Sequence, residues 1–132
     1  MFELGLKRDF IARHALLGVD GPEGQLHSHH FVVEWTLSGR ELNEQGYLVD
    51  LLELEAVLDR VTDGLRDRVL NDEPEFLGLN PSVEHLARIL AARLRPVLLS
   101  PTNATRLASS TIKVWEHERA WASWQEALPP TS

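Results

Sequence analysis

Residues 29–38 read HHFVVEWTLS, and this stretch decides the fold class. It is rich in β-branched and aromatic residues, which are the types enriched in strands. Residues 2–14 alternate loosely between apolar and polar side chains, which is typical of an antiparallel strand with one buried face. Residues 18–25, GVDGPEGQ, are dense in glycine and proline and are expected to form a connecting loop. The N-terminal part of the chain is therefore predicted to form two strands.

Two helices are predicted downstream of these strands. Asp50 and Glu53 have capping-box spacing, so their carboxylates can accept hydrogen bonds from the free backbone N–H groups at a helix start. Leucine and valine then recur at steps of three and four residues, which indicates an amphipathic helix ending near Leu70. A second apolar stripe begins around residues 81–82, and Pro96 is expected to limit or kink that helix.

The C-terminal part returns to β character. Residues 100–106 are expected to be a polar loop, residues 110–118 and 119–125 two strands, and residues 128–132, LPPTS, a tail. The order is therefore ββααββ, an α+β fold in which an antiparallel four-stranded sheet carries both helices on one face. At 132 residues the chain is expected to be a single domain spanning residues 1–132.

The second face of such a sheet has no helix to cover it. It therefore needs either polar side chains that face solvent or a partner chain. Four tryptophans bear on this point: Trp35, Trp115, Trp121 and Trp124. They fit either a packed core or a contact between copies of the chain, and the sequence leaves both interpretations open.

Composition excludes several classes of function. The formal charge of -7, from 13 Lys and Arg against 20 Asp and Glu, argues against a nucleic-acid partner, whose footprint is a basic stripe. The absence of cysteine excludes disulfides and thiolate metal sites, so a transition metal would have to be bound by histidine and carboxylate side chains. No stretch is apolar for long enough to be a signal peptide or to span a membrane, so we expect a cytoplasmic protein with no membrane partner.

Histidines at the start of the second predicted strand form a candidate metal site. Residues two apart on a strand point to the same face, so His27 and His29 share a face while His30 points the other way. His14 ends the first predicted strand, and pairing of the two strands could bring it opposite them. Zinc requires neutral imidazoles that converge on one point, and three histidines with an open fourth position are typical of a catalytic zinc. The alternative is a polar strand start whose histidines are exposed or bonded to the backbone.

Six short motifs resemble those of a known family and keep its order along the chain. FIARH at 10–14 and LHSHHF at 26–31 look like the two metal motifs of the 6-pyruvoyl-tetrahydropterin synthase family, which includes the 6-carboxy-tetrahydropterin synthases of queuosine biosynthesis. The other matches are GYLVDL at 46–51, LRDRVLND at 65–72, PSVEHLA at 81–87 and VWEHERAW at 114–121. The resemblance implies the ββααββ tunnelling fold (T-fold), in which subunits join their sheet edges into barrels and self-associate as trimers or hexamers.

The resemblance also implies roles for individual residues. The ligands of a Zn²⁺ ion would be His14, His27 and His29. Glu116 would grip the pterin, because a 2-amino-4-oxo pteridine offers a ring N–H and an amino group side by side, and a carboxylate can accept both as a charge-assisted pair. Without the resemblance, Glu116 would be interpreted as an exposed strand residue paired with Lys113 or Arg119.

Two positions depart from the family's catalytic set. Where the family usually has a cysteine shortly before its His-x-His motif, this chain has Glu23. A desolvated carboxylate can act as a base, so Glu23 is a candidate catalytic residue; the alternative is a solvated loop residue. The family's Asp-His pair appears as Asp67 and Arg68. Asp67 remains a candidate catalytic residue, whereas a guanidinium stays protonated and cannot act as acid or base at neutral pH. Arg68 would instead bind an anionic substrate group or carry a helix-surface charge.

These observations lead to three functional hypotheses. The first is a zinc-dependent lyase that binds a pterin such as 7,8-dihydroneopterin triphosphate and eliminates triphosphate, with Glu23 as base. The second is a family member with altered chemistry, either a pterin-binding protein or a lyase that cleaves a dihydroneopterin-type side chain. The third is a structural oligomer stabilised by zinc. The absence of both the cysteine and the relay histidine favours the second.

Overall fold

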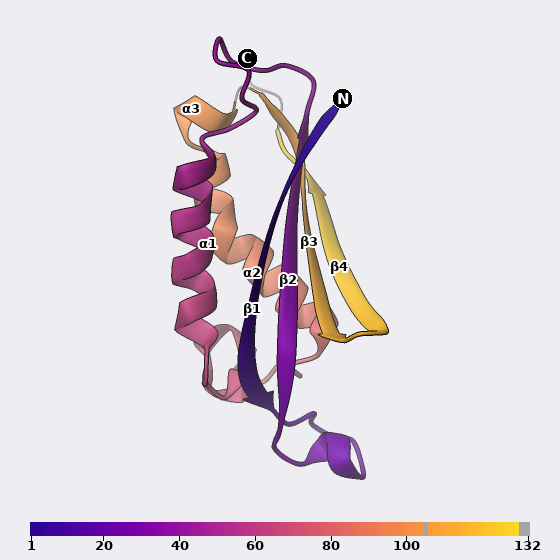
Figure 1. Cartoon of the computed structure of the whole chain (residues 1–132). Coiled ribbons are helices and arrows are strands. Elements are labelled where there is room, and N and C mark those ends of the chain that lie inside the picture. Colours follow the sequence, from indigo (N-terminus) through magenta and orange to yellow (C-terminus); the bar gives the residue numbers. More distant parts are fainter. Residues whose placement is uncertain (105, 130–132) are drawn as a thin grey trace.

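The computed structural model describes residues 1–104 and 106–129, and its elements follow the predicted ββααββ order (Figure 1). The strands and long helices are β1 (Phe2–His14), β2 (His27–Gly39), α1 (Leu51–Leu65), α2 (Val83–Leu98), β3 (Leu107–His117) and β4 (Ala120–Ala127). The shorter pieces are the 3-10 turns η1 (Pro22–Gly24), η2 (Leu70–Asp72) and η3 (Pro74–Phe76), and the helix α3 (Pro101–Ala104). Among the described residues, no helix is both long and apolar enough to cross a membrane.

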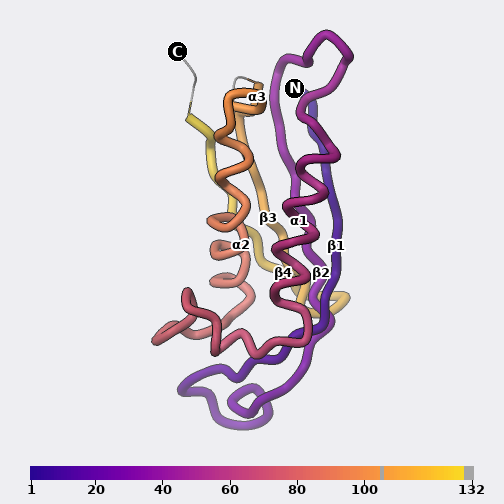
Figure 2. Tube along the Cα trace, turned by 90° about the vertical axis from the view of Figure 1, so that its left-hand side faces the viewer, coloured from indigo at the N-terminus to yellow at the C-terminus, as the bar shows by residue number. Residues whose placement is uncertain are grey.

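The four strands form one antiparallel sheet in the order β1-β2-β3-β4. Both long helices cover the same face of this sheet, as Figures 1 and 2 show. β1 and β2 pair along their whole length, from Phe2 opposite Gly39 to His14 opposite His27. The predicted class, an antiparallel four-stranded sheet with two helices on one face, is therefore confirmed.

Alternate residues of the strands build the core beneath the helices. On β2, the side chains of Phe31, Val33, Trp35 and Leu37 are at most 1% exposed, whereas the residues between them are half-buried on the open face. The helices add the leucines that the apolar periodicity indicates: Leu54, Leu58, Leu65, Leu86, Leu90 and Leu94. Burying each such side chain stabilises the fold by about 1.5–3 kcal/mol relative to leaving it in water.

The first helix ends earlier than predicted, at Leu65 and not near Leu70. Arg66 leaves the helical conformation, and Asp67 adopts a left-handed conformation with φ 62°. This turn brings the backbone beside β1, where the Asp67 N–H donates to the Ile11 carbonyl at 2.7 Å. Leu70 is nevertheless fully buried. The apolar spacing therefore continues past the helix end because of tertiary packing and not because of helical structure.

The segment predicted as a polar loop at residues 100–106 contains the short helix α3, although residue 105 lies outside the described residues. Its polar composition has a structural cause. Asn103 is fully buried, and its side-chain amide donates to the Val97 carbonyl at 2.9 Å near the end of α2. This contact falls where α2 ends, shortly after Pro96, as a helix-limiting proline predicts.

The predicted tail begins with a residue that belongs to the core. Leu128 is 9% exposed, and its N–H donates to the Ala108 carbonyl at 2.9 Å. Residues 130–132 of the predicted tail lie outside the described residues.

The tryptophans divide between the two interpretations that the sequence leaves open. Trp35 is 1% exposed in the core, and its indole N–H donates to the Ser110 hydroxyl at 3.0 Å. Trp121 and Trp124 are 51% and 38% exposed. Trp115 is half-buried on the open face, with its ring centroid 6.1 Å from that of Trp121. A contact between copies through this face stays a prediction.

Candidate metal centre

Three histidines gather at the end of the sheet where the β1–β2 loop protrudes (Figure 1). His14 lies opposite His27 in the last pair of the β1–β2 ladder, and His29 follows on the same face of β2. The ring centroids are 4.6 Å apart for His14 and His27, 5.1 Å for His14 and His29, and 4.8 Å for His27 and His29. His30 lies outside this cluster, because its Nε2 contacts the Asp9 carboxylate on the open face.

The imidazole nitrogens at the centre of the cluster have no hydrogen-bond partner. The Nε2 atoms of His14, His27 and His29 are buried and unpaired within the described residues, although buried polar atoms are normally satisfied. The Nδ1 atoms of two of them are anchored: that of His14 lies 2.7 Å from the Pro81 carbonyl oxygen, and that of His27 lies 2.7 Å from the Gln25 carbonyl oxygen. A carbonyl can only accept, so each of these Nδ1 atoms carries the hydrogen and the Nε2 of the neutral ring presents a lone pair. This donor set fits a metal ion, for which backbone-anchored imidazoles are the usual ligands.

Burial also favours the neutral form of His29. Desolvation lowers the pKa of its imidazole below the ordinary value. The Glu116 carboxylate raises this pKa without outweighing desolvation, and the neighbouring His14 and His27 lower it further. A metal ion binds the deprotonated nitrogen, so this electrostatic environment suits metal binding.

Glu116 joins the three histidines. The register between β3 and β4 shifts across residues 115–117, which leaves Glu116 without a partner on β4; such bulges re-aim side chains. The Glu116 Oε1 atom lies 3.0 Å from Nε2 of His29 and 3.6 Å from Nε2 of His14. One ligand atom from each of four residues lies within 4.8 Å of all the others: His14, His27, His29 and Glu116.

The position of Glu116 differs from the surface ion pair that the sequence alone would favour. Within the described part of the chain, no ion pair joins it to Lys113 or Arg119. The Lys113 ammonium lies instead 3.9 Å from the ring centroid of Trp121 on the open face. The alternation of side chains along β3 indicates this position in the sequence, because Glu116 lies on the same inward face as the fully buried Val114.

Glu23 lies at the rim of the cluster, on η1. Its Oε2 is 3.6 Å from Nε2 of His27, and its side chain is 53% exposed. The loop is held to the end of β1, because the Leu16 N–H donates to the Glu23 carbonyl at 2.9 Å. Gly24 follows, and a Cβ there would lie 1.9 Å from the Val19 carbonyl oxygen, so the loop path requires glycine.

The structure does not bring Asp67 into the cluster. Asp67 is exposed in the turn after α1 and is not one of the four residues whose ligand atoms gather. Arg68 is also exposed, and its carbonyl accepts the Arg13 N–H at 2.9 Å. Both residues therefore lie beside the end of β1, and the catalytic role of Asp67 stays a prediction.

Two asparagines, Asn71 and Asn80, hold the chain just after His14. Asn71 accepts from the Ala15 N–H and donates to the Ala15 carbonyl, both at 2.9 Å. Asn80 accepts from the Leu17 N–H at 3.0 Å. The motif at 65–72 contains Asn71, but its partner is distant in sequence and only the fold reveals the contact.

A cavity of about 550 Å³ lies beside the cluster. His29 and Glu116 line it together with residues of the open face, among them Lys7, Glu34 and Trp115. The indole N–H of Trp115 is buried and has no partner within the described residues. The cavity therefore gives a small molecule access to two residues of the cluster, His29 and Glu116, and its lining includes Trp115, whose indole N–H is unpaired within the described residues.

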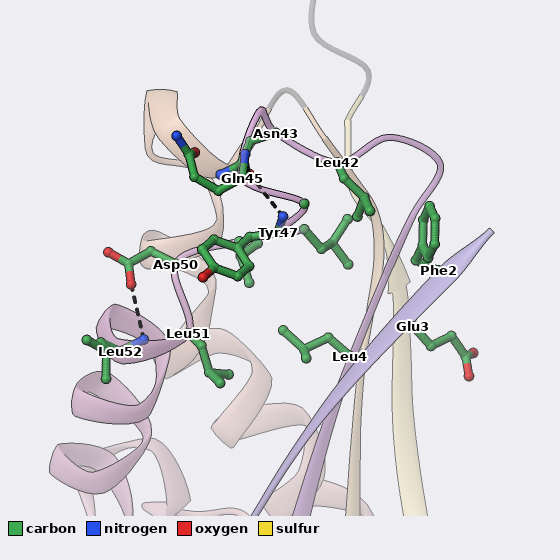
Figure 3. A pocket seen from close by; sticks show the side chains of 13 residues that line it. Phe2, Glu3, Leu4, Leu42, Asn43, Gln45, Tyr47, Asp50, Leu51 and Leu52 are labelled. Carbon is green, nitrogen blue, oxygen red and sulfur yellow. Dashed lines mark hydrogen bonds between the residues drawn. The ribbon is translucent and has the colours of Figure 1, made fainter.

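A larger cavity, of about 810 Å³, lies at the opposite end of β1 (Figure 3). Its lining is mainly apolar and contains no histidine. One of its two carboxylates is already engaged, since Asp50 accepts the Leu52 N–H at 3.1 Å and caps α1. The residues suited to chemistry are thus at the smaller cavity and not at the larger one.

Known proteins resemble this chain over most of its length. The family model for 6-pyruvoyl tetrahydropterin synthase matches residues 3–127. The dihydroneopterin monophosphate aldolase of Pyrococcus furiosus is 31% identical over 110 residues, which cover 83% of this chain and 85% of that protein. The putative 6-carboxy-5,6,7,8-tetrahydropterin synthase of Archaeoglobus fulgidus is 27% identical over 119 residues, which cover 90% of this chain and 91% of that protein.

Solved structures share the fold. The 6-pyruvoyltetrahydropterin synthase of Plasmodium vivax superposes with a TM-score of 0.80 at 15% identity, over 96% of this chain and 98% of that chain. A mutant of the same protein, in which a catalytic glutamate is replaced by alanine, gives a TM-score of 0.77 at 16% identity over the same shares. By the match of the family model and of the curated relatives, this chain belongs to the 6-pyruvoyl tetrahydropterin synthase family.

Proposed function

We propose that this protein is a zinc-dependent lyase that cleaves the carbon side chain of a 7,8-dihydropterin of the dihydroneopterin type. The observation that carries the proposal is the cluster of three Nε2 atoms that have no partner in the described part of the chain, with one carboxylate, Glu23, at its rim. Three imidazoles with room for a further ligand are typical of catalytic zinc. When bound there, Zn²⁺ would supply Lewis-acid polarisation of the side-chain oxygens of the substrate.

The pterin ring would be held by Glu116. Its carboxylate would accept the ring N–H and the amino group together, as a charge-assisted pair. The cavity that Glu116 lines has a volume of about 550 Å³, which is within the range of small-molecule sites. The side chain leaves the ring at the end remote from this N–H and amino group, so it would reach the three histidines once the Glu116 carboxylate has turned away from them.

Glu23 would be the general base. It would take the proton of the hydroxyl on the second side-chain carbon, and the bond between the first and second carbons would then break. The hydroxyl oxygen would become the carbonyl of a departing two-carbon aldehyde, and the bonding electrons would pass into the ring imine. Glu23 would then return its proton to the first carbon, so that one carboxylate serves both transfers.

Cleavage is proposed over triphosphate elimination because a single carboxylate, Glu23, can carry out both of its proton transfers. Elimination with rearrangement of the side chain moves protons at more than one carbon, and the family resemblance assigns part of that work to an Asp-His pair. This chain has Asp67 and Arg68 there, and Arg68 cannot exchange protons at neutral pH. The aldolase of Pyrococcus furiosus, at 31% identity, is a relative named for cleavage.

Triphosphate elimination is the second candidate. It is favoured by the family model, which is that of the synthase. The Plasmodium vivax synthase, with its catalytic glutamate, is a family member that works with the residue type found at position 23 of this chain. Glu23 would be the base in this reaction as well.

One assay separates the candidates. Zinc-loaded protein is incubated with 7,8-dihydroneopterin, its monophosphate and its triphosphate, and pterin products are separated by chromatography with fluorescence detection. Cleavage gives a 6-hydroxymethyl pterin and an aldehyde without release of triphosphate. Release of triphosphate with all side-chain carbons retained would instead establish the synthase reaction. Tight binding without any product would leave a pterin-binding protein.

We further propose that the protein is a cytoplasmic homo-oligomer, a trimer or a hexamer. β1 and β4 are the edges of the sheet, and exposed edges of this length favour pairing with another copy. The open face also carries Trp115 and Trp121, which a partner would cover.

A further inference from the structure

Two different partners compete for Glu116. The proposed function gives its carboxylate to the pterin, whereas in the structure its Oε1 lies 3.0 Å from Nε2 of His29 and 3.6 Å from Nε2 of His14. Both Nε2 atoms nevertheless lack a hydrogen-bond partner among the residues that the structure describes, although the shorter distance would permit a bond if the angles did. The nitrogens are thus not aimed at the carboxylate oxygen, which is the arrangement expected when both address a common point between them.

The spacing of these atoms fits a shared metal ion. Ligand atoms held about 2.0–2.2 Å from one tetrahedral zinc lie about 3.3–3.6 Å from each other. The Glu116 Oε1 atom lies 3.0 Å from Nε2 of His29, slightly below this range, and 3.6 Å from Nε2 of His14, at its upper end. All four ligand atoms lie within 4.8 Å of one another. Three imidazoles and one carboxylate are a complete donor set for tetrahedral zinc.

We propose that Glu116 is the fourth metal ligand of the pterin-free protein and that it leaves the metal when it grips the pterin. The second half of this statement rests on the proposed function, in which both Glu116 oxygens accept hydrogen bonds from the ring. Arrival of the ring thereby frees a position on the metal at the moment when the substrate's side chain is brought there. The pterin-free protein keeps its metal covered.

The location of Glu116 allows this exchange. Its side chain is 21% exposed, and it lines the cavity of about 550 Å³ together with His29. β2 continues past the last β2–β3 pair, Val32 opposite Trp115, so the sheet is open at the point where Glu116 stands. The carboxylate can therefore reach the metal cluster on one side and a ligand in the cavity on the other.

Glu23 is not an equivalent fourth ligand. It approaches a single histidine, at 3.6 Å, and its side chain is 53% exposed. It is also outside the group of four residues whose ligand atoms gather. The structure therefore separates a carboxylate that faces the metal, Glu116, from one that stands at the rim.

The first test measures Zn²⁺ affinity by competition with a colorimetric chelator. Glu116→Gln keeps the size of the side chain but removes the anionic ligand, and we expect the dissociation constant to rise about tenfold or more. Glu118→Gln is the matched control, because Glu118 is an exposed carboxylate of the same β3–β4 hairpin outside the group of four. We expect its Zn²⁺ affinity to equal that of the wild type. Wild-type affinity in a folded Glu116→Gln protein would overturn the proposal.

The second test uses the wild-type protein, so it does not depend on the folding of a variant. Co²⁺ replaces zinc, and its visible absorption reports the number and type of ligands. The probe is 6-methyl-7,8-dihydropterin, which has the ring but no side-chain oxygen to replace Glu116 on the metal. We expect the probe to change the Co²⁺ spectrum and to bind the metal-free protein more tightly than the zinc-loaded protein, because competition for one residue is reciprocal. Equal affinities with an unchanged spectrum would overturn the exchange.

The outcomes are separable from those of the lyase assay. If Glu116→Gln loses Zn²⁺ affinity and the wild-type protein forms no product from any pterin, the proposed reaction is contradicted and Glu116 is supported as a ligand. If the wild-type protein forms product and Glu116→Gln keeps its Zn²⁺ affinity, the reaction is supported and Glu116 is not a ligand. Failure of 6-methyl-7,8-dihydropterin to bind either form would contradict both the pterin grip and the exchange.

Discussion

Asn71 clasps the backbone of Ala15 with two hydrogen bonds, one accepted and one donated, both of 2.9 Å. Ala15 directly follows His14, so this contact sets the direction in which the chain leaves the end of β1 beside the histidine cluster. It also ties the segment after α1 to the sheet. The Asn71 side chain thereby helps to fix the position of His14, which is a proposed metal ligand.

Replacing Asn71 is therefore expected to weaken both folding and metal binding. Asn71→Ala leaves the Ala15 N–H and carbonyl without their partner, and we expect the free energy of unfolding to fall by about 1–3 kcal/mol. We expect the dissociation constant for Zn²⁺ to rise about tenfold, since support of a metal ligand is lost. Chemical denaturation of the metal-free protein and chelator competition measure the two effects.

The matched control is Asn43→Ala. Asn43 accepts backbone hydrogen bonds from Gln45 and Tyr47 in the loop beside the larger cavity (Figure 3). This cavity lies at the end of β1 opposite to His14. This variant is expected to lose stability while keeping its metal affinity. If both variants bound zinc like the wild type, the positioning role of Asn71 would be wrong.

Substitution of Glu23 is expected to abolish turnover and to spare the metal. Glu23→Gln keeps the shape of the rim but removes the base, and we expect the rate to fall about 100-fold or more. Asp20→Asn, another exposed carboxylate of the same loop, is the control and should retain activity. Metal content by atomic emission should equal that of the wild type in both. Full activity in Glu23→Gln would assign the base elsewhere.

The metal-free protein is expected to lose stability as pH falls below about 6.5, the ordinary pKa of histidine. Desolvation lowers the pKa of His29 in the folded state, so the unfolded chain binds a proton there more readily. Its contribution is present in full above the ordinary pKa and decreases as pH falls toward the lowered, folded-state value. Urea unfolding between pH 5 and 7.5 measures the slope. His29→Gln should flatten it, and an unchanged slope would show that another group titrates.

Metal removal is expected to destabilise the end of the sheet that carries the histidines. The ligands come from the end of β1, the start of β2 and the end of β3, so the ion would join three strands. At a free Zn²⁺ concentration of about 100 times the dissociation constant, binding adds about 2.7 kcal/mol to the free energy of unfolding. Thermal unfolding with and without a chelator measures this gain. Hydrogen exchange should rise first at residues 12–14 and 27–29.

A multiple of the 14.9 kDa chain mass is expected in solution. Three or six copies would match the predicted barrel, and light scattering coupled to size exclusion measures the mass. Trp121→Arg, on the open face, adds a charge where a partner is expected, and should reduce the mass if that face is covered. A monomer at micromolar concentration would contradict the oligomer.

The strands and helices could be read from the sequence because their signals are local. Asp50 begins α1 as its carboxylate indicates, with bonds to the Leu52 and Glu53 N–H groups. The end of α1 could not be read in this way, because Leu70 continues the apolar spacing while Asp67 has already turned the chain toward β1. That turn is decided by backbone bonds to a strand distant in sequence.

In the candidate site, too, the positions that depend on one strand could be predicted from the sequence, and those that depend on pairing between strands could not. Alternation on β2 predicts that His27 and His29 share a face, whereas the position of His14 opposite His27 depends on the register of two strands. Alternation along β3 places Glu116 on the inward face with Val114, but its nearness to these histidines depends on how β3 pairs with β2. Contacts made across the sheet are therefore the part that the sequence alone does not contain.

The histidines stand on strands, whereas Glu23 stands on a short connecting loop. Loops accept substitution and changes of length more readily than paired strands do. An evolving lineage could therefore exchange the proton-transferring residue without disturbing the metal ligands, and so change the reaction while retaining the substrate. The β1–β2 loop would then determine which reaction a family member catalyses. Comparing the length and the residues of this loop among homologues is therefore the direct way to classify those proteins by reaction.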